Sequence, residues 1–144
     1  QAAVLRRPRR CLSLDLARAY PSEAGVISWI RNIRLNRGEN VRIDDAIKLT
    51  KAESVVQHLL TCYPAEVVRA CELVIHYAPD GGSAMDFVVA FDPARFEVAV
   101  EKIKLQALED KGVREKWGDT IHRINLTAKS PRITDQYSIS VRVR

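Results

Sequence analysis

Residues 29–45 constrain the fold of this chain more than any other stretch of the sequence. Apolar and polar residues alternate up to Asn36-Arg37-Gly38, and the alternation resumes at Val41. Because strand side chains point alternately to two faces, alternation on both sides of a glycine-bearing turn predicts a β-hairpin. One face of the first strand would carry Trp29, Arg31, Ile33 and Leu35, and the other Ser28, Ile30, Asn32 and Arg34.

The same alternation recurs along the chain and predicts about nine strands, with no repeat and no long helical period. One short helical turn is expected near 110–117, ended by Gly118. Strands that are apolar on one side need a second layer, and no helix here supplies it. The sequence therefore predicts an all-β fold, an antiparallel two-sheet β-sandwich. Besides the hairpin, the strands are expected at 12–20, 54–62 (both faces at least partly covered), 67–77 (one strand), 87–91, 96–101, 121–128 and 136–143.

Length and composition favour a single domain. The 144 residues are enough for one core, and residues 12–144 are predicted to form it. Residues 1–11 hold four arginines and Pro8 without any period, which indicates a linker.

Since the chain begins with Gln1, we interpret it as a fragment of a longer chain. No apolar run approaches the roughly 20 residues that cross a bilayer, so no membrane span is predicted.

Charge is concentrated in the first third of the chain. Residues 1–42 hold nine basic and three acidic residues, whereas the remainder holds fourteen and fifteen. Such a segment attracts polyanions, among them nucleic acid, acidic polysaccharide and anionic lipid. Nucleic acid is not predicted as a partner, because no recognition helix or stacking motif accompanies the basic residues.

No constellation of catalytic or metal-binding residues is visible. His58, His76 and His122 lie in separate predicted strands without metal-ligand spacing, so no metal or other cofactor is predicted. Asp44 and Asp45 are adjacent on a strand and point to opposite faces, which argues against a shared substrate atom and favours a solvated strand edge. No catalytic residue is assigned.

Three cysteines make an odd number without CxxC spacing. Cys62 and Cys71 are able to pair only if the fold brings them face to face; buried free thiols are the alternative for Cys11, Cys62 and Cys71.

Four residues of the hairpin are candidates for substrate binding. Arg31 shares the apolar face with Trp29 and needs a carboxylate or an aromatic ring as partner. It is either a structural arginine, between the sheets or against a neighbouring domain, or an anion-binding arginine suited to a sugar carboxylate or sulfate. Trp29 is either a core residue or a platform for a sugar ring. Arg34 and Arg37 lie on the open side and at the turn, as solvated charges or as part of the same site.

An ordered set of segments resembles the carboxy-terminal β-domain of heparinase II/III-like polysaccharide lyases. The likeness runs from about residue 12 to the end, and no single motif carries it alone. Its parts are Leu14–Pro21 (LDLARAYP), Ala24-Gly25, Trp29–Arg31, Leu35–Arg37, Ile43–Asp45, Phe96–Ile103, Trp117–Asp119 and Arg123–Thr127.

The resemblance implies a parent chain in which an α/α toroid and further β-layers precede this domain. Such enzymes cut uronate-containing acidic polysaccharides, of heparin, heparan sulfate or alginate type, by β-elimination. The resemblance places the catalytic Tyr and His, the residues that neutralise the uronate carboxylate, and the ligands of any zinc upstream of Gln1. It also implies a periplasmic or secreted parent and a non-catalytic role here, buttressing or lining the cleft.

Two alternatives remain open at the level of the sequence. One is a stand-alone acidic-glycan-binding module with a basic edge formed by Arg31, Arg34, Arg37 and Arg42. The other is an immunoglobulin-like interaction domain with Trp29 and Tyr137 at a protein interface.

Overall fold

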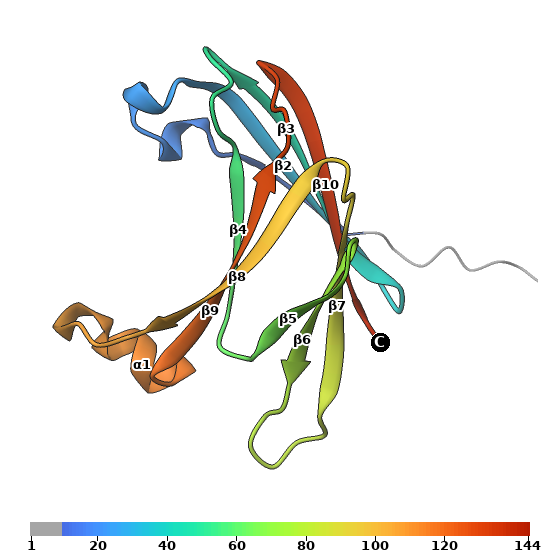
Figure 1. Cartoon of the computed structure of the whole chain (residues 1–144), viewed down its shortest axis with the longest axis vertical. Helices are drawn as coiled ribbons and strands as arrows, with labels where there is room; N and C mark the ends of the chain where they lie inside the picture. The colour runs from blue at the N-terminus through green and yellow to red at the C-terminus, as the bar shows by residue number, and fades with distance from the viewer. Residues whose placement is uncertain (1–9) are drawn as a thin grey trace, which may run out of the picture.

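The computed structural model describes residues 10–144, and it shows two packed antiparallel sheets (Figure 1). The larger sheet has seven strands in the order β1-β2-β3-β10-β7-β6-β5, and the smaller has three in the order β4-β9-β8. The predicted all-β sandwich is therefore confirmed. The strands are β1 (Arg10–Asp15), β2 (Val26–Asn36), β3 (Asn40–Leu49), β4 (Val56–Thr61), β5 (Ala65–Arg69), β6 (Glu72–Tyr77), β7 (Met85–Phe91), β8 (Phe96–Lys104), β9 (Thr120–Ala128) and β10 (Thr134–Val143).

The hairpin that was predicted around Gly38 is formed by β2 and β3. Asn36 pairs with Asn40 at its end, and Gly38 has a φ of 76°, a left-handed conformation that glycine adopts without strain. Strand β10 pairs with the other side of β3, so the carboxy-terminal strand lies in the middle of the large sheet, between β3 and β7.

The structure corrects four predictions about the strands and their connections. The linker was expected to reach residue 11, but Arg10 and Cys11 already pair with β2; residues 1–9 lie outside the described part. The first strand ends at Asp15, whose carboxylate accepts a hydrogen bond from the Ala17 amide, and 3₁₀ turns follow at Ala17–Ala19 and Ser22–Ala24.

The single strand expected over 67–77 is a second hairpin. Its two arms, β5 and β6, are joined through Ala70 and Cys71, with Arg69 opposite Glu72. The segment over 54–62 has one open face, because Leu60 is 53 % exposed although both faces were expected to be covered.

The helical prediction is confirmed. A 3₁₀ turn (Leu108–Asp110) leads into α1 (Lys111–Trp117), which ends at Gly118. The helix lies at the far end of the β8–β9 pair, away from the large sheet (Figure 1). Within residues 10–144 no helix is long and apolar enough to span a membrane.

The core lies between the two sheets and draws one parity of residues from each strand. On the small sheet Ile124 and Leu126 are fully buried, and on the large sheet Leu73 and Val89 are. The buried cluster comprises Trp29, Ile47, Leu49, Val55, Leu73, Val89, Phe91, Phe96, Ile124, Leu126, Ala128, Tyr137 and Ile139. Strand residues of this parity therefore face the core. On β6 and β7 the opposite face is covered as well, since Val74 and Val88 are only 1 % and 2 % exposed.

The three cysteines are free thiols. Cys11 and Cys71 are exposed and Cys62 is half-buried, so neither a Cys62–Cys71 disulfide nor full burial is found.

Candidate functional site

Trp29 belongs to the core. It is only 5 % exposed, and its ring stacks on that of Tyr20, with centroids 5.3 Å apart and planes within 8°. Of the two interpretations of this tryptophan, the geometry supports the structural one. Tyr137 is likewise only 3 % exposed, so these two aromatic residues do not form a surface for another protein.

Arg31 finds its carboxylate partner in Asp45 on the neighbouring strand. Its Nε and one terminal nitrogen donate to the two oxygens of Asp45 at 2.8 and 2.7 Å, a bidentate pair. Asp45 is 2 % exposed and also accepts a hydrogen bond of 2.9 Å from Gln57 Nε2 on β4. The hydrogen bond to Asp45 raises the pKa of the Arg31 guanidinium, against the opposing effect of burial. Arg31 thus joins β2 to β3, and through Asp45 to the small sheet, so the structure favours its structural role.

The interpretation of Asp44 and Asp45 as a solvated strand edge is wrong. β3 lies between β2 and β10 in the interior of the large sheet, and Asp45 is buried. The prediction that the two side chains point to opposite faces is confirmed, since Asp45 meets Arg31 and Gln57 between the sheets whereas Asp44 lies on the outer face. A buried carboxylate is tolerated here because its two oxygens accept three hydrogen bonds.

Arg34 and Arg42 lie together on the outer face of the large sheet. They are direct cross-strand neighbours on β2 and β3, and both line a hollow of about 540 Å³ that continues onto β10. This hollow is called the outer-face hollow below. Its lining residues are Asn32, Arg34, Arg42, Asp44, Asp45, Ala46, Gln136, Tyr137 and Ser138.

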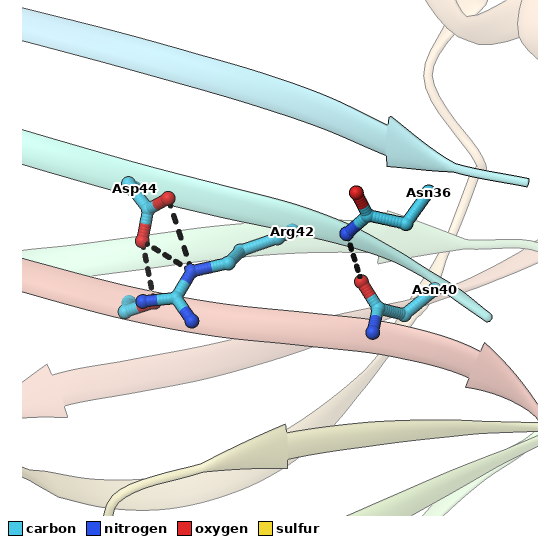
Figure 2. Close-up of polar contacts among 5 residues, drawn as sticks. Asn36, Asn40, Arg42 and Asp44 are labelled. Atoms are coloured by element: carbon cyan, nitrogen blue, oxygen red, sulfur yellow. Dashed lines mark hydrogen bonds and ion pairs between the residues drawn. The ribbon is translucent and has the colours of Figure 1, made fainter. Parts of the chain in front are cut away.

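Within the outer-face hollow, Asp44 orients Arg42. Arg42 Nε donates to the Asp44 carboxylate at 2.8 and 3.1 Å, and the Ser138 hydroxyl donates to it at 2.6 Å; Figure 2 shows Arg42 and Asp44 side by side on β3. Burial alone would raise the pKa of Asp44, but the hydrogen bonds from Ser138 and Arg42 and the nearby charge of Arg34 hold it below its usual value. Arg34 makes no hydrogen bond or ion pair with another residue of the described part.

Arg37 lies in the exposed turn of the β2–β3 hairpin. Asn36 and Asn40 on either side of this turn are joined by a hydrogen bond of 2.9 Å (Figure 2). The four candidate residues therefore do not form one site: Trp29 and Arg31 face inward, Arg34 faces outward and Arg37 is at the turn.

The idea of a basic edge formed by four arginines needs the same revision. β1 covers the free side of β2, so the hairpin is not an edge, and only Arg34 and Arg42 share a face. The sequence alone did not indicate that Asp44 and Ser138 contribute to this hollow. Parity predicts that Asp44 shares a face with Arg42, but nothing local predicts that Ser138, 94 residues away, lies beside it.

The histidines do not converge on a metal site. Among residues 10–144 no group of three or more histidine, cysteine or acidic side chains is arranged to hold a metal ion. His58 contacts Asn125, whereas His76 lies between Asp86 and Glu66 at 2.9 and 3.1 Å.

His76 gives the stability a pH dependence with a defined sign. A hydrogen bond with Asp86, and to a smaller extent one with Glu66, raises the pKa of His76. Its contribution is therefore complete below the unfolded-state pKa of about 6.5 and is lost as the pH rises through the higher folded-state value. The free energy of unfolding, measured by urea denaturation, is expected to fall between about pH 6 and pH 8 by less than about 1 kcal/mol, because the His76 side chain is exposed.

His76→Gln is the control for this measurement. His76→Gln should remove most of the decrease in the free energy of unfolding between about pH 6 and pH 8. The contribution of His122 remains in this variant and has the opposite sign, because burial and Lys102 lower the pKa of His122. An unchanged slope in His76→Gln would contradict the assignment.

Comparison with known proteins does not assign the chain to a family. No protein-family model matches the chain, and no curated protein matches it.

Proposed function

We propose that this chain is the non-catalytic carboxy-terminal β-sandwich of a heparinase II/III-like polysaccharide lyase, whose outer-face hollow contacts the acidic polysaccharide. The ordered set of sequence segments described above supports the family, and the two-sheet sandwich agrees with it. The observation that carries the proposed contact is the pairing of Arg34 with Arg42 in a hollow on the outer face.

The charges of the hollow suit an anionic sugar. Asp44 and Asp45 both line the hollow, but Asp45 is already paired with Arg31. The guanidinium groups of Arg34 and Arg42 therefore share one remaining carboxylate, that of Asp44, and one positive charge is left over. Arg42 is held in place through its Nε, whereas Arg34 has no ion-pair partner in the described part of the chain. A planar guanidinium holds the two oxygens of a carboxylate or sulfate at once. Asn32, Gln136 and Ser138 add polar groups that hydrogen-bond sugar hydroxyls.

The proposed role in the reaction is to position substrate. In β-elimination a base removes the proton at C5 of the uronate, the bond from C4 to the glycosidic oxygen breaks, and an unsaturated uronate remains. The charge that develops beside the uronate carboxylate needs a neutralising partner. We assign the base, the acid and this partner, like any zinc, to the part of the parent chain before Gln1. The residues of the present domain buttress the cleft and hold a flanking anionic unit.

The contact is tested by backbone amide NMR on the 144-residue chain with heparin and alginate oligosaccharides. We expect salt-sensitive shifts clustered on β2, β3 and β10 around Arg34 and Arg42, because exposed charge pairs weaken as salt screens them. Arg34→Ser/Arg42→Ser is expected to lower the affinity about tenfold, the equivalent of about 1.4 kcal/mol.

The matched control is Arg69→Ser/Arg132→Ser, which removes the same charge from other exposed positions. Equal losses in the two double variants would mean that net charge alone attracts the glycan, and the hollow would then have no special role. Shifts confined to other strands would contradict the assignment in the same way.

The non-catalytic half of the proposal has its own test. The 144-residue chain is incubated with heparin, heparan sulfate and alginate, and the absorbance of unsaturated uronate is followed. We expect no increase; an increase would show that the chain cleaves the polysaccharide by itself.

A further inference from the structure

A second hollow, of about 310 Å³, opens at one end of the sandwich, where the chain crosses from β3 to β4. It is called the end hollow below. Its walls come from the 3₁₀ segment, the start of β2, the end of β3 and the crossing itself. The lining residues are Tyr20, Glu23, Ala24, Val26, Trp29, Leu49, Lys51, Glu53, Ser54, Val55 and Val56. Its volume is at the lower end of the range of small-molecule sites.

One wall of the end hollow is aromatic. Tyr20 is 39 % exposed and stacks on the buried Trp29. The Trp29 indole nitrogen is shielded from solvent and has no hydrogen-bond partner. An indole N–H is only a donor, and leaving it buried without an acceptor is costly, so this wall lacks one acceptor oxygen.

The rim of the end hollow is polar and carries more negative than positive charge. Glu23 and Glu53 supply two carboxylates and Lys51 one ammonium group, while Ser54 adds a hydroxyl. Lys51 is already paired with Glu53 at 3.0 Å. A uronate or sulfate would therefore be repelled here, in contrast to the outer-face hollow.

We propose that the end hollow binds one uncharged sugar unit. A sugar ring presents a face of C–H groups, which packs on the half-exposed ring of Tyr20, and an edge of hydroxyl groups, which suits a rim of carboxylate, ammonium and hydroxyl. In this proposal a sugar hydroxyl oxygen also serves as the acceptor that the Trp29 N–H lacks. The site is distinct from the proposed contact with acidic glycan, because Trp29 faces the core and Arg34 the outer face.

The test uses the indole N–H signals of the ¹⁵N-labelled 144-residue chain. The chain has two tryptophans, so Trp29 and the half-exposed Trp117 give two resonances. Glucose, N-acetylglucosamine and glucuronate are each titrated to high millimolar concentration. We expect a saturating shift of the Trp29 signal with the two uncharged sugars, no shift of Trp117, and about tenfold weaker binding of glucuronate.

Tyr20→Ala is expected to weaken binding about tenfold, whereas Tyr63→Ala, which removes a tyrosine on another part of the molecule, should leave it unchanged. If Tyr20→Ala fails to fold, Glu53→Gln serves instead, since its side chain is 74 % exposed; it should narrow the gap between glucuronate and glucose. The proposal is overturned if no sugar moves the Trp29 signal, if the shift does not saturate, or if glucuronate binds as well as glucose. Loss of this response leaves the outer-face contact standing, because that contact is followed on β2, β3 and β10 with charged oligosaccharides.

Discussion

Asp45→Ala is expected to lower the free energy of unfolding by about 3–5 kcal/mol, because it breaks a buried ion pair by removing one partner. Asp45 is 2 % exposed and accepts hydrogen bonds from Arg31 and from Gln57. Without the carboxylate, the half-buried guanidinium and the buried amide each lose an acceptor. The measurement is urea unfolding followed by circular dichroism, with the midpoint and slope compared with the parent.

Asp44→Ala is the matched control, since it removes the adjacent carboxylate from the other face of the same strand. Its side chain is 30 % exposed, and that of its partner Arg42 is 51 % exposed, so Arg42 is solvated without it. A loss of about 1 kcal/mol is expected. Equal losses at the two positions would contradict the placement of Asp45 between the sheets.

A double variant separates the ion pair from the space that it fills. Arg31→Met/Asp45→Leu replaces both charges with apolar groups and is expected to recover much of the loss, because a buried pair is often no more stabilising than well-packed apolar residues. A double variant as unstable as Asp45→Ala would show that the pair itself contributes most of the stability at this position.

The alternation of side chains between the two faces of a strand is the part of the fold that the sequence predicts best. The alternation around Gly38 predicts both strands of the hairpin and places Arg31 and Arg34 on opposite faces, as found. The β5–β6 turn was missed because it consists of Ala70 and Cys71 and contains no glycine, proline or asparagine, the residues that usually mark a turn. The 3₁₀ turns after Asp15 were missed because three residues are too short for a helical period.

The candidate site is harder to predict, because its parts meet across strands that are distant in sequence. The sequence indicates that Arg31 needs a carboxylate or an aromatic ring as partner, but it does not identify that partner. Only the register of β2 on β3, which places Asp45 opposite Arg31, identifies it as Asp45. Ser138 reaches Asp44 because β10 inserts between β3 and β7, a pairing that no local pattern specifies. Long-range pairing, rather than local propensity, decides which side chains share the outer-face hollow.

The second large effect is expected at the centre of the small sheet. Leu126 on β9 has no exposed surface, and it packs in the cluster that also holds Trp29 and Tyr137. Leu126→Ala should lower the free energy of unfolding by about 3–5 kcal/mol, because burial of the methyl groups is lost and a cavity remains. The loss is measured by urea unfolding.

Leu60→Ala on the neighbouring strand makes the same chemical change on the other face. Leu60 is 53 % exposed, so its truncation should change the free energy of unfolding by no more than about 0.5 kcal/mol. Similar losses in the two variants would mean that a further layer covers the outer face of the small sheet in solution. A large loss at Leu126 alone would fix the inner face of the three-stranded sheet, and with it the side from which Gln57 reaches Asp45.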